Sequence, residues 1–204
     1  MGLFFASLGW IVITYLLGSL PFGLFLAKAC KGLDPRMHGS KNTGATNVAR
    51  TCGTGFGLLT FALDAAKGFV PLLIAMAISG SGLFLFLTAL AALLGHMYSV
   101  FLNWQGGKGV ATYIGIFAAL SPAALFWALI LCLLIIWITG FVSLGSLSLV
   151  TVLPLFVLLS GQFLPFLLAL VTMLLIYSRH KQNILRLARG EENPWSRKSF
   201  QHTG

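Results

Sequence analysis

A polar stretch of the chain, residues 39–50, combines residue types that bind phosphate esters. Gly39 and Gly44 permit backbone turns that expose amide groups, while Lys41 and Arg50 add fixed positive charge. Hydroxyl and amide side chains complete the stretch: Ser40, Asn42, Thr43, Thr46 and Asn47. No Asp or Glu interrupts it, so it suits a phosphate ester at a membrane surface. A solvated basic loop between two membrane helices is the simpler alternative.

A second glycine-rich stretch, residues 103–112, surrounds a single lysine. Its glycines are Gly106, Gly107 and Gly109. A helix that begins near Val110 would direct its first amide groups toward an anion that Lys108 also attracts. A tight turn would use the same glycines, so this stretch alone is a weak signal. Two such loops on one membrane face are the stronger indication.

A basic segment near the C-terminus, residues 177–192, carries the last candidate ligands. If the segment is helical, Arg179, Asn183 and Arg186 share one face, and His180 flanks it. In the chemical interpretation, His180 and Asn183 orient a hydroxyl or a phosphate, and Arg179 adds charge. In the alternative, the segment is a juxtamembrane anchor for anionic lipid headgroups.

Several familiar chemistries do not fit the sequence. The chain has four acidic residues, of which only Asp64 falls in a plausible pocket, so we expect no metal cluster and no cofactor. A serine triad lacks its acid, and no Gly-x-Ser-x-Gly elbow occurs. The His-x4-Asp pattern of many glycerolipid acyltransferases is absent, because Phe101 follows His96 and Leu185 follows His180 at that spacing. Cations, hydroxyls and backbone donors remain, and these can position phosphate esters and stabilise developing negative charge.

The composition places the chain in a membrane. It has 204 residues, of which 58% are hydrophobic and 8% are charged, whereas soluble domains carry about 25% charged residues. We therefore expect one integral membrane domain over residues 1–204, with about 191–204 forming a loosely ordered cytoplasmic tail. The net charge of +9 does not indicate nucleic-acid binding, because the cations lie in short polar segments between apolar spans.

Breaks in the apolar pattern divide the chain into seven candidate spans. They cover about residues 3–29, 57–78, 83–102, 110–120, 123–138, 143–159 and 163–177. Some are shorter than the ~20 residues that a full crossing requires, so these must be bent, re-entrant or buried among neighbours. The first cation, Lys28, follows the first span, which predicts an uncleaved helix with its N-terminus outside and the next loop inside.

Five longer spans would also give an outside N-terminus and a cytoplasmic C-terminus. Seven crossings, however, place Ser143 and Ser146 on the cytoplasmic face with both phosphate loops, whereas five would place them outside. We therefore predict an all-α polytopic membrane protein with seven transmembrane helices, some of them short or kinked.

Two features lie within the predicted spans. Residues 18–23 hold Pro21 between glycines, which predicts a break in the first helix that serves packing or contacts substrate. Asp64 and Lys67, three residues apart, lie on one helical face. They are either a self-neutralising pair or face the active-site pocket, and we favour a structural or orienting role for Asp64.

Taken in order, the motifs resemble one family over nearly the whole chain. They are residues 18–23, 39–50, 64–68, His96 with 106–112, 143–146 and 179–184. As a set they resemble the bacterial membrane-integral glycerol-3-phosphate acyltransferases that use acyl-phosphate as donor. This resemblance implies acyl transfer to the 1-hydroxyl of glycerol 3-phosphate, which gives lysophosphatidic acid and inorganic phosphate. It also implies a bacterial inner-membrane protein with seven helices and a cytoplasmic active site.

The resemblance also suggests residue roles. Acyl-phosphate would lie against Ser40, Asn42, Thr43, Gly44 and Thr46. Arg50 and Lys108 would supply charge to the phosphates, and glycerol 3-phosphate would be held by Ser143 or Ser146, His180 and Asn183. The catalytic candidates are thus Ser40, Arg50, Lys108, His180 and Asn183. Asn47, Gly106, Gly107, Gly109 and Arg179 join the other residues as substrate-binding candidates.

The same resemblance implies partners. Acyl-phosphate is the donor, its own phosphate is thought to help take the acceptor proton, and a peripheral acyl-phosphate synthase is an implied neighbour. The alternative is a membrane transporter of a phosphorylated anion, which would also need a basic wet pocket. A transporter predicts polar residues through the membrane and inverted repeats, and the sequence has neither beyond Asp64 and Lys67.

Overall fold

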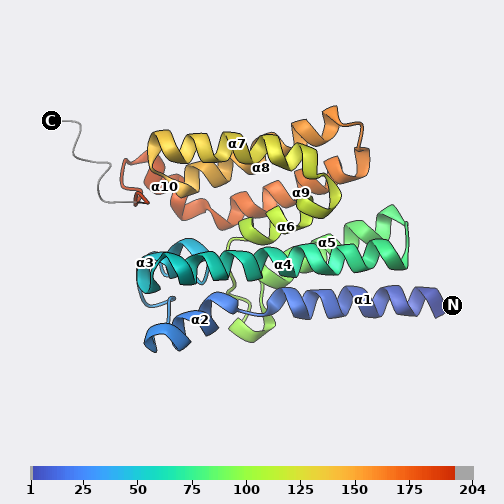
Figure 1. Cartoon of the computed structure of the whole chain (residues 1–204), viewed down its shortest axis with the longest axis horizontal. Coiled ribbons are helices and arrows are strands. Elements are labelled where there is room, and N and C mark those ends of the chain that lie inside the picture. The colour runs from blue at the N-terminus through green and yellow to red at the C-terminus, as the bar shows by residue number, and fades with distance from the viewer. Residues whose placement is uncertain (1, 196–204) are drawn as a thin grey trace. The chain divides into compact units, whose positions relative to one another are not determined.

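The computed structural model describes residues 2–195, and this part of the chain is helical without a strand (Figure 1). The helices in chain order are α1 (Gly2–Ser19), α2 (Phe22–Lys31), α3 (Ala45–Cys52), α4 (Thr54–Ile78), α5 (Gly82–Met97), the 3-10 turn η1 (Val100–Leu102), α6 (Val110–Leu120), α7 (Pro122–Thr139), α8 (Val142–Leu159), α9 (Phe163–Arg179) and α10 (Lys181–Ala188). The prediction of an all-α protein is confirmed.

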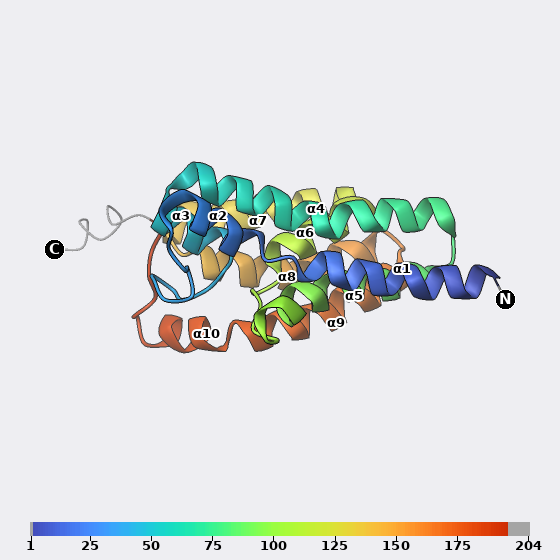
Figure 2. The ribbon, with the colours of Figure 1, turned by 90° about the horizontal axis from the view of Figure 1, so that it is seen from below.

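The chain forms two compact units, Met1–Leu120 and Ser121–Gly204. In the first unit, α1 packs along α5, α4 packs along α6, and the short helix α3 lies against α4 (Figure 2). In the second unit, α8 packs between α7 and α9, and α10 contacts the end of α9. Each unit therefore positions its own set of candidate ligands, and the prediction of a single domain stays a prediction.

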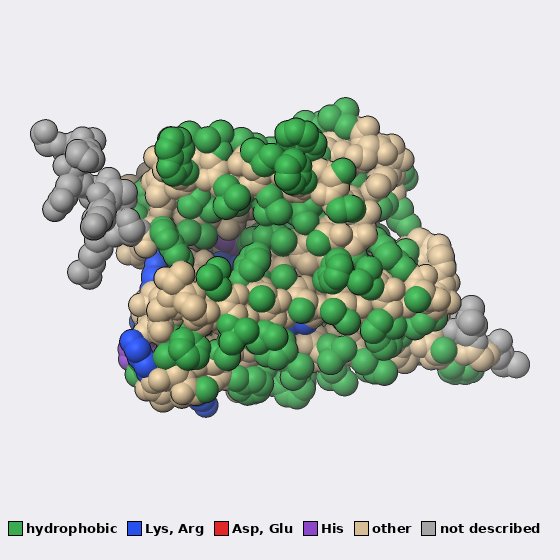
Figure 3. All heavy atoms as spheres, in the orientation of Figure 1, with side chains coloured by type: hydrophobic (Ala, Val, Ile, Leu, Met, Phe, Trp, Pro, Cys, Tyr) green, Lys and Arg blue, Asp and Glu red, His purple; other side chains and the backbone are tan. Residues whose placement is uncertain are grey.

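The outer surface of the helices is apolar, as in a membrane protein. Hydrophobic side chains cover most of the face shown in Figure 3, and Trp137 is 82% exposed and Leu159 is 74% exposed. Helical stretches long and apolar enough to cross a membrane are Phe5–Lys31, Thr54–Ile78, Gly82–Leu102, Pro122–Thr139 and Val142–Leu159. Such a surface would cost solvation free energy in water, so it belongs in lipid.

The number of crossings is not fixed by this count. The described residues contain 5 helices of sufficient length, or up to 6 if the bent pair α9 and α10 forms one span. Helix α6 is apolar but has only 11 residues. The seven-span prediction therefore remains a prediction.

The predicted break in the first span is confirmed. Helix α1 ends at Ser19 and α2 begins at Phe22, with Pro21 between them. Proline has no backbone donor and cannot continue the helical ladder. The carbonyl groups of Ser19 and Leu20 receive side-chain donors from elsewhere in the same unit: Ser99, between α5 and η1, and Lys67 of α4.

The last described residues pack against the second unit rather than extending from it. The amide of Glu191 donates to the carbonyl of Arg186 at 2.8 Å, and that of Trp195 donates to the carbonyl of Gly140 at 2.7 Å. The side chain of Glu192 is buried. The loosely ordered tail predicted from about residue 191 therefore has an ordered start, and residues 196–204 lie outside the described part of the chain.

Candidate active site

Residues 39–50, here called the first phosphate-type loop, fold around the side chain of Asn47, which is 1% exposed in α3. Its Oδ1 accepts a hydrogen bond from the amide of Ser40 at 2.8 Å. Its Nδ2 donates to the carbonyl oxygens of Pro35 at 2.8 Å, His38 at 3.0 Å and Asn42 at 2.8 Å. Since this amide is engaged with the loop backbone, we expect Asn47 to shape the loop rather than to contact substrate.

The backbone of this loop takes conformations that few residues adopt. Gly39 and Lys41 have positive φ, 59° and 53°, and a Cβ at residue 39 would meet Asn47 Oδ1. Asn42 Oδ1 accepts from the amide of Gly44 at 2.8 Å, which closes the turn into α3. Glycine at residue 39 therefore lets the loop close tightly around Asn47.

The ligand candidates of this loop differ in exposure. Ser40, Asn42, Gly44 and Thr46 are half-buried, and Arg50 is exposed on α3. Thr43 is buried and lines a pocket. Ser40, Asn42, Thr43 and Gly44 thus lie in the loop before α3, while Thr46 and Arg50 lie in α3 itself. Their contact with substrate stays a prediction.

Asp34, which precedes this loop, forms an ion pair with Arg36. The Arg36 guanidinium donates to both of its oxygens, with Nη2 to Oδ2 at 2.6 Å. These hydrogen bonds lower the pKa of the Asp34 carboxyl to about 2.

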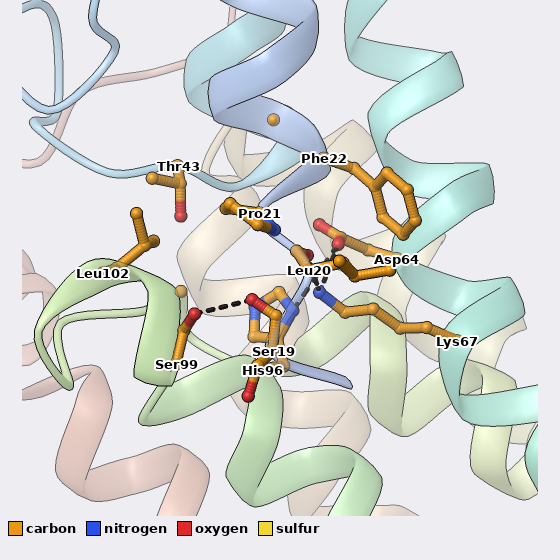
Figure 4. Close-up of a pocket in the computed structure, with 12 residues that line it drawn as sticks. Ser19, Leu20, Pro21, Phe22, Thr43, Asp64, Lys67, His96, Ser99 and Leu102 are labelled. Atoms are coloured by element: carbon orange, nitrogen blue, oxygen red, sulfur yellow. Dashed lines mark hydrogen bonds and ion pairs between the residues drawn. The ribbon is translucent and has the colours of Figure 1, made fainter. Parts of the chain in front are cut away.

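A small pocket of about 210 Å³, open solvent included, lies in the first unit (Figure 4). It is lined by Ser19, Leu20, Pro21, Phe22, Gly23, Thr43, Asp64, Lys67, His96, Ser99, Leu102 and Gly107. Thr43 comes from the first phosphate-type loop and Gly107 from the second. The structure thus brings the two sequence-predicted loops to one pocket.

A buried charged cluster forms one wall of this pocket. Lys67 Nζ lies 2.7 Å from Asp64 Oδ1, and His96 Nδ1 lies 3.6 Å from the same oxygen. All three side chains are buried. The sequence-predicted pair of Asp64 and Lys67 is confirmed, and the two alternatives for it both hold in part, because the residues pair with one another and also line the pocket.

Side chains that line this pocket also donate hydrogen bonds to the break between α1 and α2. Lys67 Nζ donates to the carbonyl of Leu20 at 3.0 Å, and Ser99 Oγ donates to the carbonyl of Ser19 at 2.6 Å (Figure 4). The ammonium of Lys67 also lies 5.7 Å from the ring centre of Phe22. Our sequence-derived site omitted these residues, although an ionisable pair within an apolar span is a signal that could have included Lys67.

The second glycine-rich loop folds against the end of α5. The amide of Gly106 donates to the carbonyl of Met97, and that of Gly107 donates to the carbonyl of His96, each at 3.0 Å. The last carbonyls of a helix lack intrahelical donors. The two glycine amides supply hydrogen bonds to these carbonyls at the end of α5. The expected cradle of glycine amides is therefore not formed by Gly106 and Gly107, whose amides hold the loop to its own helix.

The rest of that loop follows the prediction more closely. Gly109 has a φ of 91° and directly precedes α6, which begins at Val110 as expected. Lys108 is half-buried at this helix start. The N-terminal end of a helix favours anions, so Lys108 remains the candidate phosphate ligand of the loop.

The second unit carries the remaining candidates. Ser143 and Ser146 lie in the first turns of α8 and are buried. His180 is 2% exposed at the junction where α9 and α10 meet at a bend of 66°. Its Nδ1 lies 2.8 Å from the carbonyl oxygen of Ile176, and because a carbonyl only accepts, this nitrogen carries the proton.

Glu192 joins three side chains of the second unit. Its Oε1 accepts from Ser143 Oγ at 2.9 Å and from Asn183 Nδ2 at 2.8 Å, and its Oε2 accepts from Arg186 Nε at 2.8 Å. Arg179 is half-buried at the end of α9. The sequence-predicted residues Ser143 and Asn183 are thus brought together by a residue that sequence reasoning had placed in the tail.

Comparison with known proteins identifies relatives over most of the chain. A family model described as "Glycerol-3-phosphate acyltransferase" matches residues 8–190. A curated glycerol-3-phosphate acyltransferase of Nitratidesulfovibrio vulgaris is 55% identical over 94% of this chain, and the chain spans only 59% of that relative's length. One of Maridesulfovibrio salexigens is 48% identical, with 93% of this chain and 97% of the relative covered.

Solved structures give the same result. A crystal structure of PlsY (YgiH), an integral membrane glycerol 3-phosphate acyltransferase in its glycerol 3-phosphate form, matches with a TM-score of 0.90 and 42% identity. That match covers 94% of this chain and 96% of the PlsY chain. The lysophosphatidic acid form matches with a TM-score of 0.87, also at 42% identity, and covers 93% and 95%. This chain belongs to the glycerol-3-phosphate acyltransferase family of integral membrane proteins.

Proposed function

We propose that the chain transfers the acyl group of acyl-phosphate to the 1-hydroxyl of glycerol 3-phosphate, the first acylation of phospholipid biosynthesis. The acceptor oxygen forms a bond to the acyl carbon while the bond from that carbon to the phosphate oxygen breaks. The hydroxyl proton passes to the departing phosphate, so the products are lysophosphatidic acid and inorganic phosphate. The observation that carries the proposal is the pocket at which Thr43 and Gly107, from the two phosphate-type loops, meet.

In this proposal the first unit binds the donor. The candidate ligands are Ser40, Asn42, Thr43, Gly44 and Thr46, with Arg50 and Lys108 supplying charge. Charge-assisted hydrogen bonds to phosphate are stronger than neutral ones, and they strengthen as negative charge grows on the leaving phosphate.

The second unit binds the acceptor. Three buried polar residues of this unit suit a small polyol phosphate: Ser143 in α8, His180 at the junction of α9 and α10, and Asn183 in α10. Ser146 and Arg179 lie on the same elements and remain candidates. The N–H of His180 is directed at Ile176, so its other ring nitrogen can accept a hydrogen bond when the ring is neutral.

The proposed topology has seven spans, an outside N-terminus and a cytoplasmic C-terminus in a bacterial inner membrane. Helix α6 is the short fourth span, and its buried residues Tyr113, Ile116 and Phe117 suit a position among neighbouring helices. Cations gather from the last turn of α2 onward, as the positive-inside rule expects of a cytoplasmic segment: Lys28, Lys31, Arg36, Lys41 and Arg50. Both units form one acyltransferase domain, served by a peripheral acyl-phosphate synthase.

The test uses the purified full chain with palmitoyl-phosphate and radiolabelled glycerol 3-phosphate. We expect labelled lysophosphatidic acid in the lipid extract, formed in proportion to protein and time. A transporter is the alternative, and it predicts protein-dependent uptake of labelled glycerol 3-phosphate into proteoliposomes without acylation. Uptake without a lipid product from folded protein would replace the acyltransferase with the transporter.

A further inference from the structure

The carboxylate of Glu192 accepts hydrogen bonds from three side chains that lie in two helices. Ser143 lies in α8, while Asn183 and Arg186 lie in α10, and all three bond to Glu192 within 2.9 Å. The carboxylate is buried, with the residue only 7% exposed. Hydrogen bonds from or to charged groups are about twice as strong as neutral ones, so this contact fixes the direction of each donor.

The segment that carries Glu192 is held at both ends. Glu191 is tied by its amide to the end of α10, and Trp195 by its amide to Gly140 in the turn before α8. The backbone thus passes from α10 back to the start of α8. The side chain between these two anchors has a defined place, and its approach to Ser143 does not depend on residues 196–204.

The direction of the Ser143 hydrogen bond has a chemical consequence. A serine hydroxyl has one proton and two acceptor sites. The Ser143 hydroxyl donates its hydrogen bond to the carboxylate of Glu192. The remaining lone pairs of Ser143 Oγ can only accept. A phosphate dianion offers acceptors and would be repelled by the neighbouring carboxylate, whereas a glycerol hydroxyl offers a donor.

We propose that Glu192 is a positioning residue of the acceptor site, which turns Ser143 into a hydrogen-bond acceptor for a glycerol hydroxyl and fixes Asn183 and Arg186 beside it. This inference rests on the proposed function, because it assigns the glycerol end of glycerol 3-phosphate to Ser143. The phosphate end then lies away from Glu192. Arg186 balances the charge of the carboxylate, with its Nε 2.8 Å from Oε2.

The test measures equilibrium binding of two ligands to the full-length detergent-solubilised protein by isothermal titration calorimetry. Glycerol 3-phosphate has the hydroxyls, and propyl phosphate has the same phosphate ester without them. We expect E192A and E192L, which have no acceptor at this place, to weaken glycerol 3-phosphate binding by about tenfold, the loss of one oriented hydrogen bond. E192Q keeps an oxygen that can accept from Ser143 and should lose less. Propyl phosphate binding should change by less than about twofold.

Matched variants separate positioning from a structural effect. E191A removes an equal charge from the exposed neighbouring residue and should bind both ligands as wild type does. S143A should lose the same affinity as E192L, and S143A/E192L should lose no more than S143A alone, because Glu192 acts through Ser143. Thermal unfolding checks that E192L is folded, and S143A, which leaves Glu192 in place, carries the same prediction if E192L is unstable.

Three results would overturn the inference: unchanged glycerol 3-phosphate affinity in E192L, an equal loss for both ligands, or tighter binding in E192A. The last would mean that the carboxylate blocks the site. The acylation assay is scored separately on the same preparations. Wild-type product formation without an effect of Glu192 overturns this inference alone, whereas selective binding loss without any product overturns the proposed function alone.

Discussion

Lys67 reaches from α4 to the carbonyl oxygen of Leu20 at 3.0 Å, at the point where α1 is broken. The same ammonium lies 2.7 Å from Asp64. One buried cation therefore stabilises both a buried carboxylate and a carbonyl that the break has deprived of its helical donor. The shape of the pocket depends on this contact, because Leu20 and Asp64 both line it.

Replacing Lys67 tests that dependence. K67M should destabilise the protein by about 3 kcal/mol or more, because it leaves the Asp64 carboxylate buried without its cation. Thermal unfolding in detergent measures the loss. The double variant K67M/D64N should recover part of it, and K28M, at an exposed cation, serves as the control. A stability of K67M equal to that of K28M would contradict the role assigned to this pair.

Asn47 tests the loop. N47A removes the donor of three backbone carbonyls and the acceptor of the Ser40 amide, and each unsatisfied buried group costs about 1–3 kcal/mol. We expect a higher KM for acyl-phosphate and a lower Tm, with KM for glycerol 3-phosphate less affected. N47D, which keeps only the acceptor, should behave as N47A does. M37A, at an exposed residue of the same segment, is the matched control.

Arg50 and Lys108 test the electrostatic part of the mechanism. R50A and K108A should each lose roughly 2 kcal/mol of transition-state stabilisation, about 30-fold in kcat/KM, if they contact phosphates. Steady-state kinetics with both substrates measures this loss. R189A removes an exposed cation outside the site and should retain wild-type kinetics. Near-wild-type kinetics in R50A or K108A would remove that residue from the site.

His180 tests whether a buried ring binds or reacts. H180A should raise KM for glycerol 3-phosphate and leave kcat nearly intact, because the ring positions the acceptor by binding that is uniform between ground state and transition state. Its Nδ1 is already directed at the carbonyl of Ile176. A fall in kcat at an unchanged KM would instead make His180 a participant in the chemical step.

The fold was largely predictable because its signals are local. Pro21 marked the break between α1 and α2, and Val110 was correctly placed at the start of a helix. The buried pair of Asp64 and Lys67 followed from its three-residue spacing. A helix period and the composition of a span can be read within one segment, so these features needed no tertiary information.

The site was less predictable because its contacts join distant residues. Glu192 bonds Ser143 across 49 residues, and nothing in the polar sequence around it indicates that partner. The sequence predicted an anion cradle from the amides of Gly106 and Gly107, yet these amides donate to the carbonyls of Met97 and His96 at the end of α5. Asn47 could have been a ligand or a support, and only the position of the loop backbone favours the support.

The most direct test of the account is a comparison of donors with the purified wild-type chain. Palmitoyl-phosphate and palmitoyl-CoA are offered in parallel with glycerol 3-phosphate, and lysophosphatidic acid and inorganic phosphate are both counted. The account predicts product from palmitoyl-phosphate alone, with one phosphate released for each lysophosphatidic acid formed. Product from palmitoyl-CoA without phosphate release would contradict it.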